Sequence, residues 1–494
     1  MCRYGNAVIA VALAVYFFLI PFAILVRHLS DPALRQPGVP KFAFRLHRAL
    51  SPKYERWARR RVASGDAGTL ALDDISATEW PLFGSVFYLW ATESLQEAWE
   101  KDHTLSPVQP KENARGAIEA AAALVADPGH ASWVKRHWGD DYLHNENVFY
   151  RMLLISGLTS YEKLTGDGKY LPLLRDQVET LSAALDESQH GLLDDYPGEC
   201  YPGDVLVAIA AIQRADGLLG TDRSTFVERA IRAFEGDLLD STGLPPYSAS
   251  SHTGVVTSRA RGCSNSYVLI FAPELWRETA SQWYASYEKH FWQTRWGCCG
   301  FREFPRGDPS SEWYMDVDAG PVVAGYGVSA SAFGIAGARA NGRFDHAYPL
   351  SAEALVMSWP LPDGALLTPR LLSNLTDAPY VGEASLLYCF TRQPVDGVEI
   401  TTGGRLPAIV YIGLAIYLLV GLLIVADNVR RLWRWRRAPR EVLHANAQLA
   451  VWAILLVLGV CLGLLVSWAW GLISILIAQV LPRSRRRAKA APGN

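Results

Sequence analysis

Long apolar segments lie at the two ends of this 494-residue chain. Ala7 to Val26 carries no charge and is long enough for a helix to span a bilayer. No small-residue cleavage site precedes Arg27, so we expect residues 7–27 to form an uncleaved transmembrane anchor. Residues 406–427 are expected to form a second transmembrane helix. Residues 448–481 are too long for one upright span, and two interpretations stay open: a tilted transmembrane helix or a hairpin.

Between these ends the pattern is mostly helical. Residues 28–67 are basic and contain several prolines, which predicts a juxtamembrane linker with an amphipathic helix from about Pro52 to Val62. Across residues 68–395, apolar residues recur at helical spacing between loops that hold Gly, Pro and Asp. Candidate helices cover residues 80–99, 112–126, 146–165, 168–187, 204–219, 223–237, 264–275, 277–291 and 320–341.

Helices that follow one another in pairs predict an all-α toroid, in which an outer ring of helices covers a buried inner ring. A buried inner ring would explain why Val205 to Ile212 is apolar on nearly all its faces. Strand-like alternation is confined to short pieces near residues 383–401.

The hydrophobic content and the net charge of the chain limit the classes of partner that it could bind. Hydrophobic residues make up 50% of the chain and the formal net charge is −2, so there is no basic field to bind nucleic acid. We expect a lipid bilayer and a small apolar or amphiphilic substrate as partners, and the oligomeric state stays open.

Basic clusters bear on the orientation of an integral protein of the cell membrane, because Lys and Arg favour the cytoplasmic side. They lie in residues 27–61, in residues 430–440 and in the basic tail, residues 482–494. If each of the three apolar segments spans the membrane once, the first and third clusters lie on one side and the second cluster lies on the other. The soluble domain is then on the side with two basic clusters, which favours a cytoplasmic domain. A hairpin at residues 448–481 would reverse that preference, so the side stays open.

Known cofactor and metal motifs are missing from the sequence. The seven cysteines include no C-x-x-C pair, and no Gly-rich phosphate loop, G-x-S-x-G elbow or H-E-x-x-H motif occurs. We therefore predict no metal and no organic cofactor, which leaves acid–base chemistry by carboxyl groups and tyrosine.

Carboxyl groups gather in two polar loops. The run from Asp194 to Asp204 holds four of them, and crowding raises the pKa of one member of such a set. Asp204 also suits a helix N-cap, which would need no chemistry. In the second loop, Asp316 and Asp318 precede an apolar helix, where capping explains only one of them. The catalytic candidates are Asp195, Asp204, Tyr267, Glu303, Asp316 and Asp318.

Other side chains are candidates for substrate binding because they neighbour these acids or share a helix face. Cys263 and Tyr267 lie one turn apart at the start of a helix. The remaining candidates come from the start of the 146–165 helix, from the Asp194–Asp204 loop and from the aromatic residues before Asp316. They are Asn147, Tyr150, Tyr201, Cys200 and Trp313.

The order of the motifs between Trp138 and Gly342 resembles the linalool dehydratase/isomerase family. The segment N-E-N-V-F-Y…Y-E-K-L-T-G is similar to the family's K-E-N-I-M-Y…Y-Q-L-V-T-G helix. Further similar segments are the loop and helix of residues 195–208, the G-T-D of residues 220–222, Tyr247 to His252, Cys263 to Tyr267, Arg302-Glu303 and Asp316 to Gly320.

The resemblance implies an (α/α)6 barrel over residues 68–395. It also implies an apolar pocket in which acid–base residues dehydrate or isomerise a terpenoid alcohol without a cofactor. The chain departs from the family pattern at the residues that are expected to carry out the reaction. Asp195 and Asp204 stand where the family has two cysteines, Leu153 stands where it has a histidine, and no residue from Pro81 to Tyr88 matches its early aspartate.

Two other functions fit the same residues. A carbohydrate-active α/α-barrel hydrolase or lyase would also use paired carboxyl groups. A non-catalytic membrane protein could use the same helices as a binding module. The lining of the pocket distinguishes the three: apolar walls favour a terpenoid, stacked Trp with Asn, Asp and Arg favours a sugar, and a collapsed pocket favours the binding module.

Overall fold

The structure is a computed structural model that describes residues 2–71, 74–308 and 312–437, together with Leu455, Gly459, Gly471, Ser474 and Ile475. The chain divides into two compact units. The larger unit is Ala23–Leu414, and the smaller one combines Met1–Phe22 with Ala415–Asn494. Apart from those five positions, residues 448–481, expected as the third apolar span, and the tail at residues 482–494 lie outside the described residues.

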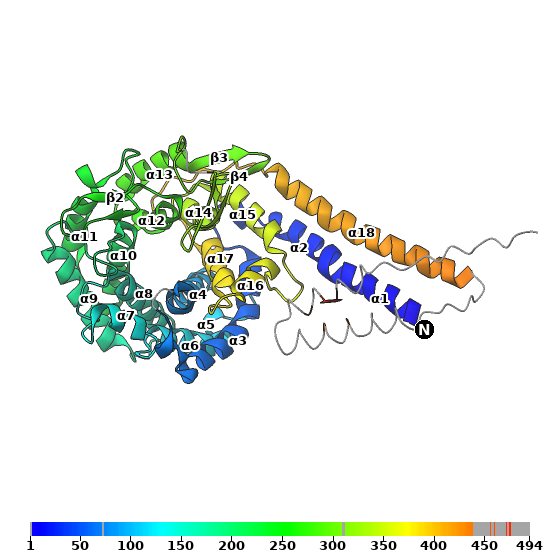
Figure 1. The fold of residues 1–494 in the computed structure, drawn as a ribbon, viewed down its shortest axis with the longest axis horizontal. Helices are drawn as coiled ribbons and strands as arrows, with labels where there is room; N and C mark the ends of the chain where they lie inside the picture. Colours follow the sequence, from blue (N-terminus) through cyan, green and yellow to red (C-terminus); the bar gives the residue numbers. More distant parts are fainter. Residues whose placement is uncertain are drawn as a thin grey trace, which may run out of the picture. The chain divides into compact units, whose positions relative to one another are not determined.

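The chain is mostly helical, as the sequence predicts. Six helices of the larger unit form a series in which each packs against the next, and the last packs against the first (Figure 1). In order they are α4 (Ile75–Lys101), α8 (Val148–Thr165), α10 (Pro202–Leu219), α12 (Gly262–Leu275), α14 (Val328–Ala340) and α17 (Val381–Thr391).

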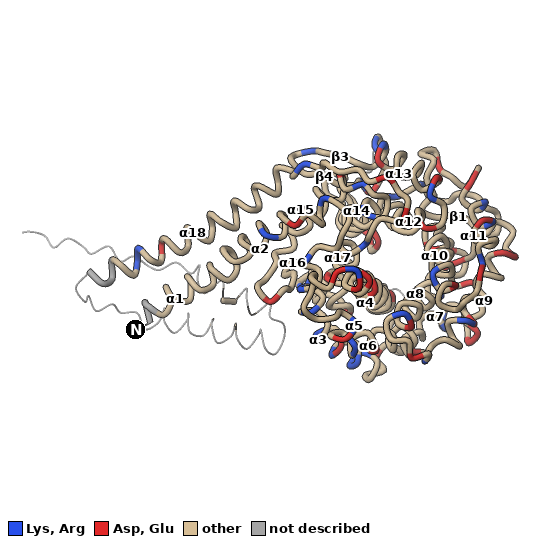
Figure 2. Tube along the Cα trace, turned by 180° about the vertical axis from the view of Figure 1, so that it is seen from behind, with Lys and Arg blue, Asp and Glu red and all other residues tan. Residues whose placement is uncertain are grey.

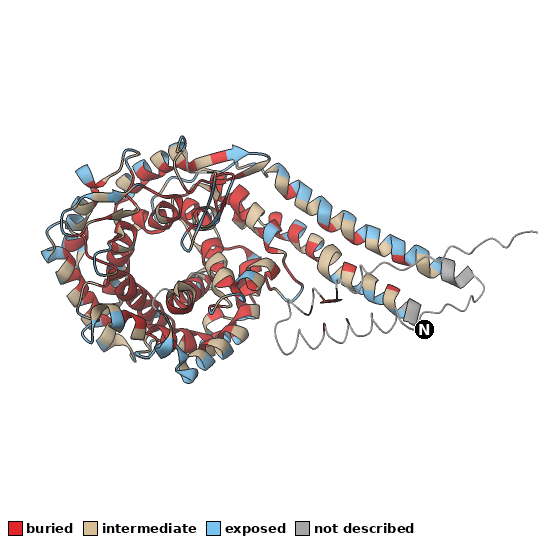
Figure 3. Cartoon of the chain, in the orientation of Figure 1, coloured by how far each residue is buried: buried red, intermediate tan, exposed pale blue. Residues whose placement is uncertain are grey.

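These six helices are buried on several faces because apolar or small residues occupy nearly all their positions. In α8, sixteen of the eighteen residues from Val148 to Thr165 are buried. Figure 3 shows the same burial along α10 and α12, whereas the helices outside them carry both buried and exposed residues. A helix that is apolar all round is stable only when neighbours cover it, so the helices of the series depend on their packing partners.

The ends of these helices follow from local chemistry. Asp74 caps α4, because its side chain accepts a hydrogen bond from the Ala77 backbone N–H. Gly166 and Gly220 end α8 and α10 in the left-handed conformation, which glycine adopts without a steric penalty.

A second set of helices packs against the outside of the series. It consists of α3 (Lys41–Ser64), α6 (Arg115–Val125), α9 (Leu171–Glu187), α11 (Ser224–Ala230), α13 (Arg277–Phe291), α15 (Phe344–Ser358) and α16 (Leu367–Ser373). Shorter helices are η2 (Pro32–Leu34), η3 (Asp66–Thr69), η4 (His103–Leu105), α5 (Pro110–Asn113), α7 (Ser132–Trp138), η5 (Ile231–Phe234) and η6 (Gly236–Leu238).

Helix α3 includes the amphipathic helix expected from about Pro52 to Val62 and begins earlier, at Lys41, where a linker was expected within residues 28–67. Phe42, Leu46 and Leu50 follow one another at helical spacing and are buried, and α3 packs against α6 and α17. The basic residues of this segment occupy the other faces of the helix, so the charge and proline content hid an amphipathic pattern.

Three small antiparallel sheets interrupt the helices. They are β1 (Ser248–Ala249) with β2 (Val256–Ser258), β3 (Trp292–Arg295) with β4 (Cys298–Phe301), and β5 (Trp313–Asp316) with β6 (Gly320–Val323) and β7 (Tyr326–Gly327). The helix expected over residues 320–341 therefore begins only at Val328, because Gly320–Val323 pairs with β5. The alternation near residues 383–401 does not form a strand, since Val381–Thr391 is α17.

Two helical stretches, Gly5–Leu29 and Ala408–Trp433, are long and apolar enough to cross a membrane. Only 17% of the most apolar window of each is buried, unlike a core helix of a soluble protein. Charged residues stand only towards the ends of these stretches (Figure 2). The first comprises α1 (Cys2–Ala14), η1 (Val15–Leu19) and α2 (Ile20–Leu29), and the second lies within α18 (Ala408–Arg437).

The π-helical turn η1 has a local cause. Pro21 has no backbone N–H, so the chain loses one i→i−4 hydrogen bond just after this turn. In the smaller unit, Gly421 of α18 lies close to Leu19, where a Cβ would come within 2.5 Å of Leu19 Cδ2. Small residues permit such close helix contacts in membranes.

The first prediction concerns the contact between α12 and the loop after β4. A Cβ at Gly262 would lie 1.9 Å from the Arg302 carbonyl oxygen, so Gly262→Ala should destabilise the protein by about 1–3 kcal/mol, as overpacking does. Gly217→Ala in α10 is the control, because no atom lies within 4 Å of its Cβ position. Thermal unfolding in detergent should show a lower midpoint for Gly262→Ala alone; equal midpoints would contradict the packing.

The second prediction concerns membrane attachment. Because the two apolar stretches expose most of their side chains, full-length protein should stay in the membrane fraction after a carbonate wash and be released by detergent. Recovery of the intact chain in the carbonate supernatant would contradict this.

Candidate functional site

The six packed helices direct their N-terminal ends towards one cavity of about 620 Å³. Each helix contributes a lining residue from its first two positions: Ile75, Phe149, Gly203, Cys263, Ser329 and Val381. Helix N-termini carry partial positive charge, so this end of the unit is suited to acidic or electron-rich groups.

Four carboxyl groups line the cavity. Glu79 comes from α4, Glu199 from the loop before α10, Asp204 from α10 and Asp318 from the turn between β5 and β6. No Lys or Arg is among the lining residues, and Asp318 and Glu79 raise the pKa of Asp204. His137 also lines the cavity, but burial lowers its pKa, so the acids lack a cation in the lining near neutral pH.

Asp204 is the acid with the fewest protein contacts. Tyr201 is the N-cap of α10, so Asp204 lies in the first turn and is not the cap. Its side chain makes no hydrogen bond to any residue in the described ranges. Loss of hydration, followed by repulsion from Asp318 and Glu79, raises its pKa to about 8. Near neutral pH this carboxyl group holds its proton and can donate it to a bound molecule.

Glu79 and Asp318 each accept a hydrogen bond from a tyrosine. The Tyr196 hydroxyl donates to Glu79 Oε1, and the Tyr247 hydroxyl donates to Asp318 Oδ2. Burial raises the pKa of Glu79 to about 7 despite the Tyr196 hydrogen bond. Burial also raises the pKa of Asp318, against the lowering effect of Tyr247.

Aromatic rings form much of the remaining wall. Phe83 contacts Phe87, Phe149 and Tyr267 at centroid distances of 4.8, 5.7 and 5.8 Å, and Phe333 lies 5.5 Å from Tyr267. The Tyr267 hydroxyl lines the cavity and is buried without a hydrogen-bond partner among the residues that the structure describes. A buried hydroxyl without a partner is costly, so a ligand hydroxyl would satisfy it.

A charged layer lies behind the wall. Arg261 Nε is 2.7 Å from Glu303 Oε1, and Arg261 Nη2 is 2.7 Å from Asp316 Oδ2. Glu303 Oε1 also lies 3.0 Å from the Cys263 Sγ atom, which donates to it. Glu303 and Asp316 are thus held by Arg261, and neither lines the cavity.

The remaining predicted site residues occupy different places. Tyr201 lines the cavity, whereas Asp195 and Cys200 are buried outside the lining. Asp195 Oδ2 accepts a hydrogen bond from the Tyr201 backbone N–H at 2.7 Å. Burial and the nearby Asp204 hold the pKa of Asp195 well above its usual range.

The three other predicted binding residues do not line the cavity. Asn147 is buried at the start of α8, where its side chain donates to the Tyr142 carbonyl oxygen at 3.2 Å. Tyr150 is buried and packs edge-on against Trp133. Trp313 is 71% exposed on β5.

Sequence reasoning missed the lining residues Glu79, Tyr196, Glu199 and Tyr247, and it did not propose the aromatic residues Phe83 and Phe87. Glu79, Phe83 and Phe87 follow one another at four-residue spacing, so they share one face of α4. An acid in line with an aromatic stripe was the available signal for a cavity wall.

Metal ligands are not gathered in the part of the chain that the structure describes, where no group of three or more His, Cys, Asp or Glu side chains could hold an ion. The described cysteines Cys200, Cys263, Cys298, Cys299 and Cys389 are free thiols. The cavity offers carboxyl groups, tyrosine hydroxyls and aromatic faces.

No protein-family model matches the chain, and no curated protein matches it.

The third prediction follows from the raised pKa values of Asp204 and Glu79. An unfolded carboxyl group titrates near ~4. Between that pH and about 7 to 8, the folded protein keeps protons that the unfolded chain releases, so raising the pH favours unfolding. Each such proton contributes at most about 1.4 kcal/mol per pH unit.

Thermal midpoints should therefore fall as the pH rises from 5 to 8, and Asp204→Asn should flatten this slope. The matched control is Asp237→Asn, because Asp237 is exposed on η6 and outside the cavity. An equal slope in all three proteins would show that Asp204 does not titrate as argued.

Proposed function

We propose that the protein is a membrane-anchored, cofactor-independent acid–base enzyme that dehydrates or isomerises an apolar, terpenoid-like alcohol. One observation carries the proposal: a single cavity combines four carboxyl groups with aromatic walls and has no Lys or Arg in its lining. This combination provides a proton donor, a proton acceptor and rings that stabilise positive charge in an apolar substrate.

The proposal includes the architecture. The six packed helices would be the inner ring of an (α/α)6 barrel, and the outer helices from α3 to α16 would cover them. The stretches Gly5–Leu29 and Ala408–Trp433 would anchor the chain as an integral protein of the cell membrane. The basic clusters of the sequence lean towards a cytoplasmic barrel if residues 448–481 span once.

The linalool dehydratase/isomerase resemblance enters as part of the proposal. Asp204 and Asp195, which stand where the family has cysteines, would keep acid–base capacity with carboxyl groups. Glu79 lines the cavity just before Pro81–Tyr88, the segment without a match to the family's early aspartate, and would take that place.

The chemistry follows from the protonation states. Asp204 would protonate the substrate hydroxyl, and the C–O bond would break to release water and leave an allylic cation. Phe83, Phe333 and Tyr267 surround the cavity, and their ring faces would stabilise that cation. Asp318 would remove a proton from the neighbouring carbon, which forms the C=C bond. Proton exchange with solvent would then restore both groups.

The other functions fit the cavity less well. A sugar site would present stacked Trp with amide and guanidinium side chains, but Trp80 is the single Trp in the lining, which holds no Asn, Gln or Arg. A collapsed pocket would favour a non-catalytic binding module, and a cavity of about 620 Å³ does not.

The fourth prediction is that Asp204→Asn abolishes turnover. The amide keeps the size of the side chain and loses the acidic proton, and removing a general acid costs about 10²–10⁴-fold in rate. Purified full-length protein should be incubated with acyclic terpenoid alcohols, and the alkene and isomer products measured by gas chromatography.

The exposed Asp237→Asn variant should keep the wild-type rate. Equal far-UV spectra and a single cooperative unfolding transition would show that the Asp204→Asn protein is folded. A fully active Asp204→Asn protein would remove Asp204 from the mechanism, and a wild type that converts no such alcohol would overturn the proposed substrate class.

A further inference from the structure

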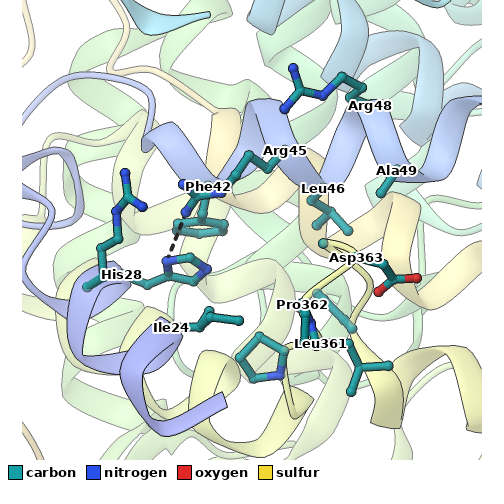
Figure 4. Close-up of a pocket in the computed structure, with 14 residues that line it drawn as sticks. Ile24, His28, Phe42, Arg45, Leu46, Arg48, Ala49, Leu361, Pro362 and Asp363 are labelled. Atoms are coloured by element: carbon teal, nitrogen blue, oxygen red, sulfur yellow. Dashed lines mark hydrogen bonds between the residues drawn. The ribbon is translucent and has the colours of Figure 1, made fainter. Parts of the chain in front are cut away.

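A second cavity, of about 450 Å³, lies in the larger unit and is not part of the carboxyl site. Its walls come from the last turns of the apolar stretch Gly5–Leu29, from the start of α3 and from residues 360–366 (Figure 4). It is therefore placed where the chain leaves an expected membrane span.

Three arginines line this cavity: Arg27 from α2, and Arg45 and Arg48 from α3. None of the three forms an ion pair with a carboxylate among the described residues. Repulsion from Arg27 and Arg48 adds to the effect of burial and lowers the pKa of Arg45. Like charges held together without a counterion are unfavourable, so the arrangement lacks an anion.

The acidic residues nearby are engaged elsewhere. Asp31 accepts hydrogen bonds from the backbone N–H groups of Ala33 and Lys41. Asp363 lines the cavity but pairs with Lys53 at 3.2 Å. Asp31 is close enough to raise the pKa of Arg45, but neither carboxylate forms an ion pair with Arg27, Arg45 or Arg48 among the described residues.

The position of Arg45 is fixed by His28. Arg45 Nη2 lies 3.3 Å from His28 Nδ1, and the buried imidazole stacks on Phe42 at 4.8 Å (Figure 4). A guanidinium group only donates, so Nδ1 is the acceptor and the neutral His28 carries its proton on Nε2. Arg45 is thereby held in place before any ligand binds.

Apolar side chains complete the cavity. Ile24, Leu46 and Leu361 lie beside the guanidinium groups, and Phe42, Ala49 and Leu366 extend the same wall. Guanidinium groups recognise phosphate oxygens in a planar, two-pronged geometry, and an aliphatic wall suits a hydrocarbon chain.

We propose that this cavity binds the phosphate group of an anionic lipid, with Arg27, Arg45 and Arg48 on the headgroup and the Ile24–Leu46–Leu361 wall on the chain. Anionic headgroups are attracted to basic residues beside a membrane span. The site is separate from the carboxyl cavity, so the lipid-binding proposal does not depend on the proposed enzyme activity.

The test uses purified full-length protein in an uncharged detergent. Dihexanoyl phosphatidic acid, dihexanoyl phosphatidylcholine and inorganic phosphate are each titrated, and binding is followed by calorimetry and by the unfolding midpoint. Phosphatidic acid should bind saturably at one site and at least about tenfold more tightly than either of the others, as expected for charge-assisted contacts plus a buried chain.

Substitutions of the residues that line the cavity test whether the lipid binds there. Arg48→Gln should weaken phosphatidic acid binding by about tenfold, the worth of a hydrogen bond to a charged group. Arg48 is exposed, so its loss leaves the fold intact, whereas Arg45→Gln removes the half-buried member. Arg56→Gln is the control, since Arg56 is exposed on α3 and outside the cavity.

Asp363→Asn should tighten phosphatidic acid binding by about two- to fivefold, because it removes a negative charge beside the cavity.

Equal affinity for phosphatidic acid and inorganic phosphate would overturn the lipid assignment. Equal affinity for phosphatidic acid and phosphatidylcholine would show that the net negative charge of the lipid does not decide binding, and would overturn the assignment to an anionic lipid. Wild-type affinity in both Arg48→Gln and Arg45→Gln would show that the lipid binds elsewhere and would overturn the site.

Discussion

Loss of hydration at carboxyl groups is the constraint that governs the candidate site. Glu79, Asp204 and Asp318 share an aromatic cavity with no Lys or Arg in its lining, and an ionised carboxylate in such surroundings is costly. The chain meets this cost by different means at each acid. Tyr196 and Tyr247 donate hydrogen bonds to Glu79 and Asp318, whereas Asp204 has no donor among the described residues and keeps its proton.

The helical framework makes this arrangement possible. Six helices meet the cavity with their first turns, so the backbone supplies partial positive charge where the acids gather. Arg261 lies one layer behind and pairs with Glu303 and Asp316. It does not line the cavity, but its charge lowers the pKa of Asp318. Glu79, Asp204 and Asp318 thus face the cavity, whereas Glu303 and Asp316 pair with Arg261 behind the cavity wall.

The sequence predicted the helical class, and five of the twelve side chains proposed for the site line the candidate cavity: Tyr201, Asp204, Cys263, Tyr267 and Asp318. Asp204 and Asp318 were found because acids in Gly- and Pro-containing loops before apolar helices point to a pocket. Their neighbours Asp195, Glu303 and Asp316 looked equivalent, since a linear pattern does not show that Arg261 pairs with two of them or that Asp195 is covered. Glu79 was missed because its helix face is otherwise aromatic, and such a face suits a core as well as a cavity. The first part of α3, before Pro52, was missed for a related reason: its basic faces outweighed the buried Phe42, Leu46 and Leu50.

Infrared spectroscopy of the full-length protein tests the protonation of Asp204 most directly, because a protonated carboxyl group absorbs apart from a carboxylate. The account predicts a protonated-carboxyl band at pH 7 that is weaker in Asp204→Asn than in the wild type. The difference between the two proteins should disappear when the pH is raised well above about 8, where Asp204 ionises. A protonated-carboxyl band of equal intensity in the two proteins at pH 7 would show that Asp204 is already ionised and would contradict its role as a proton donor.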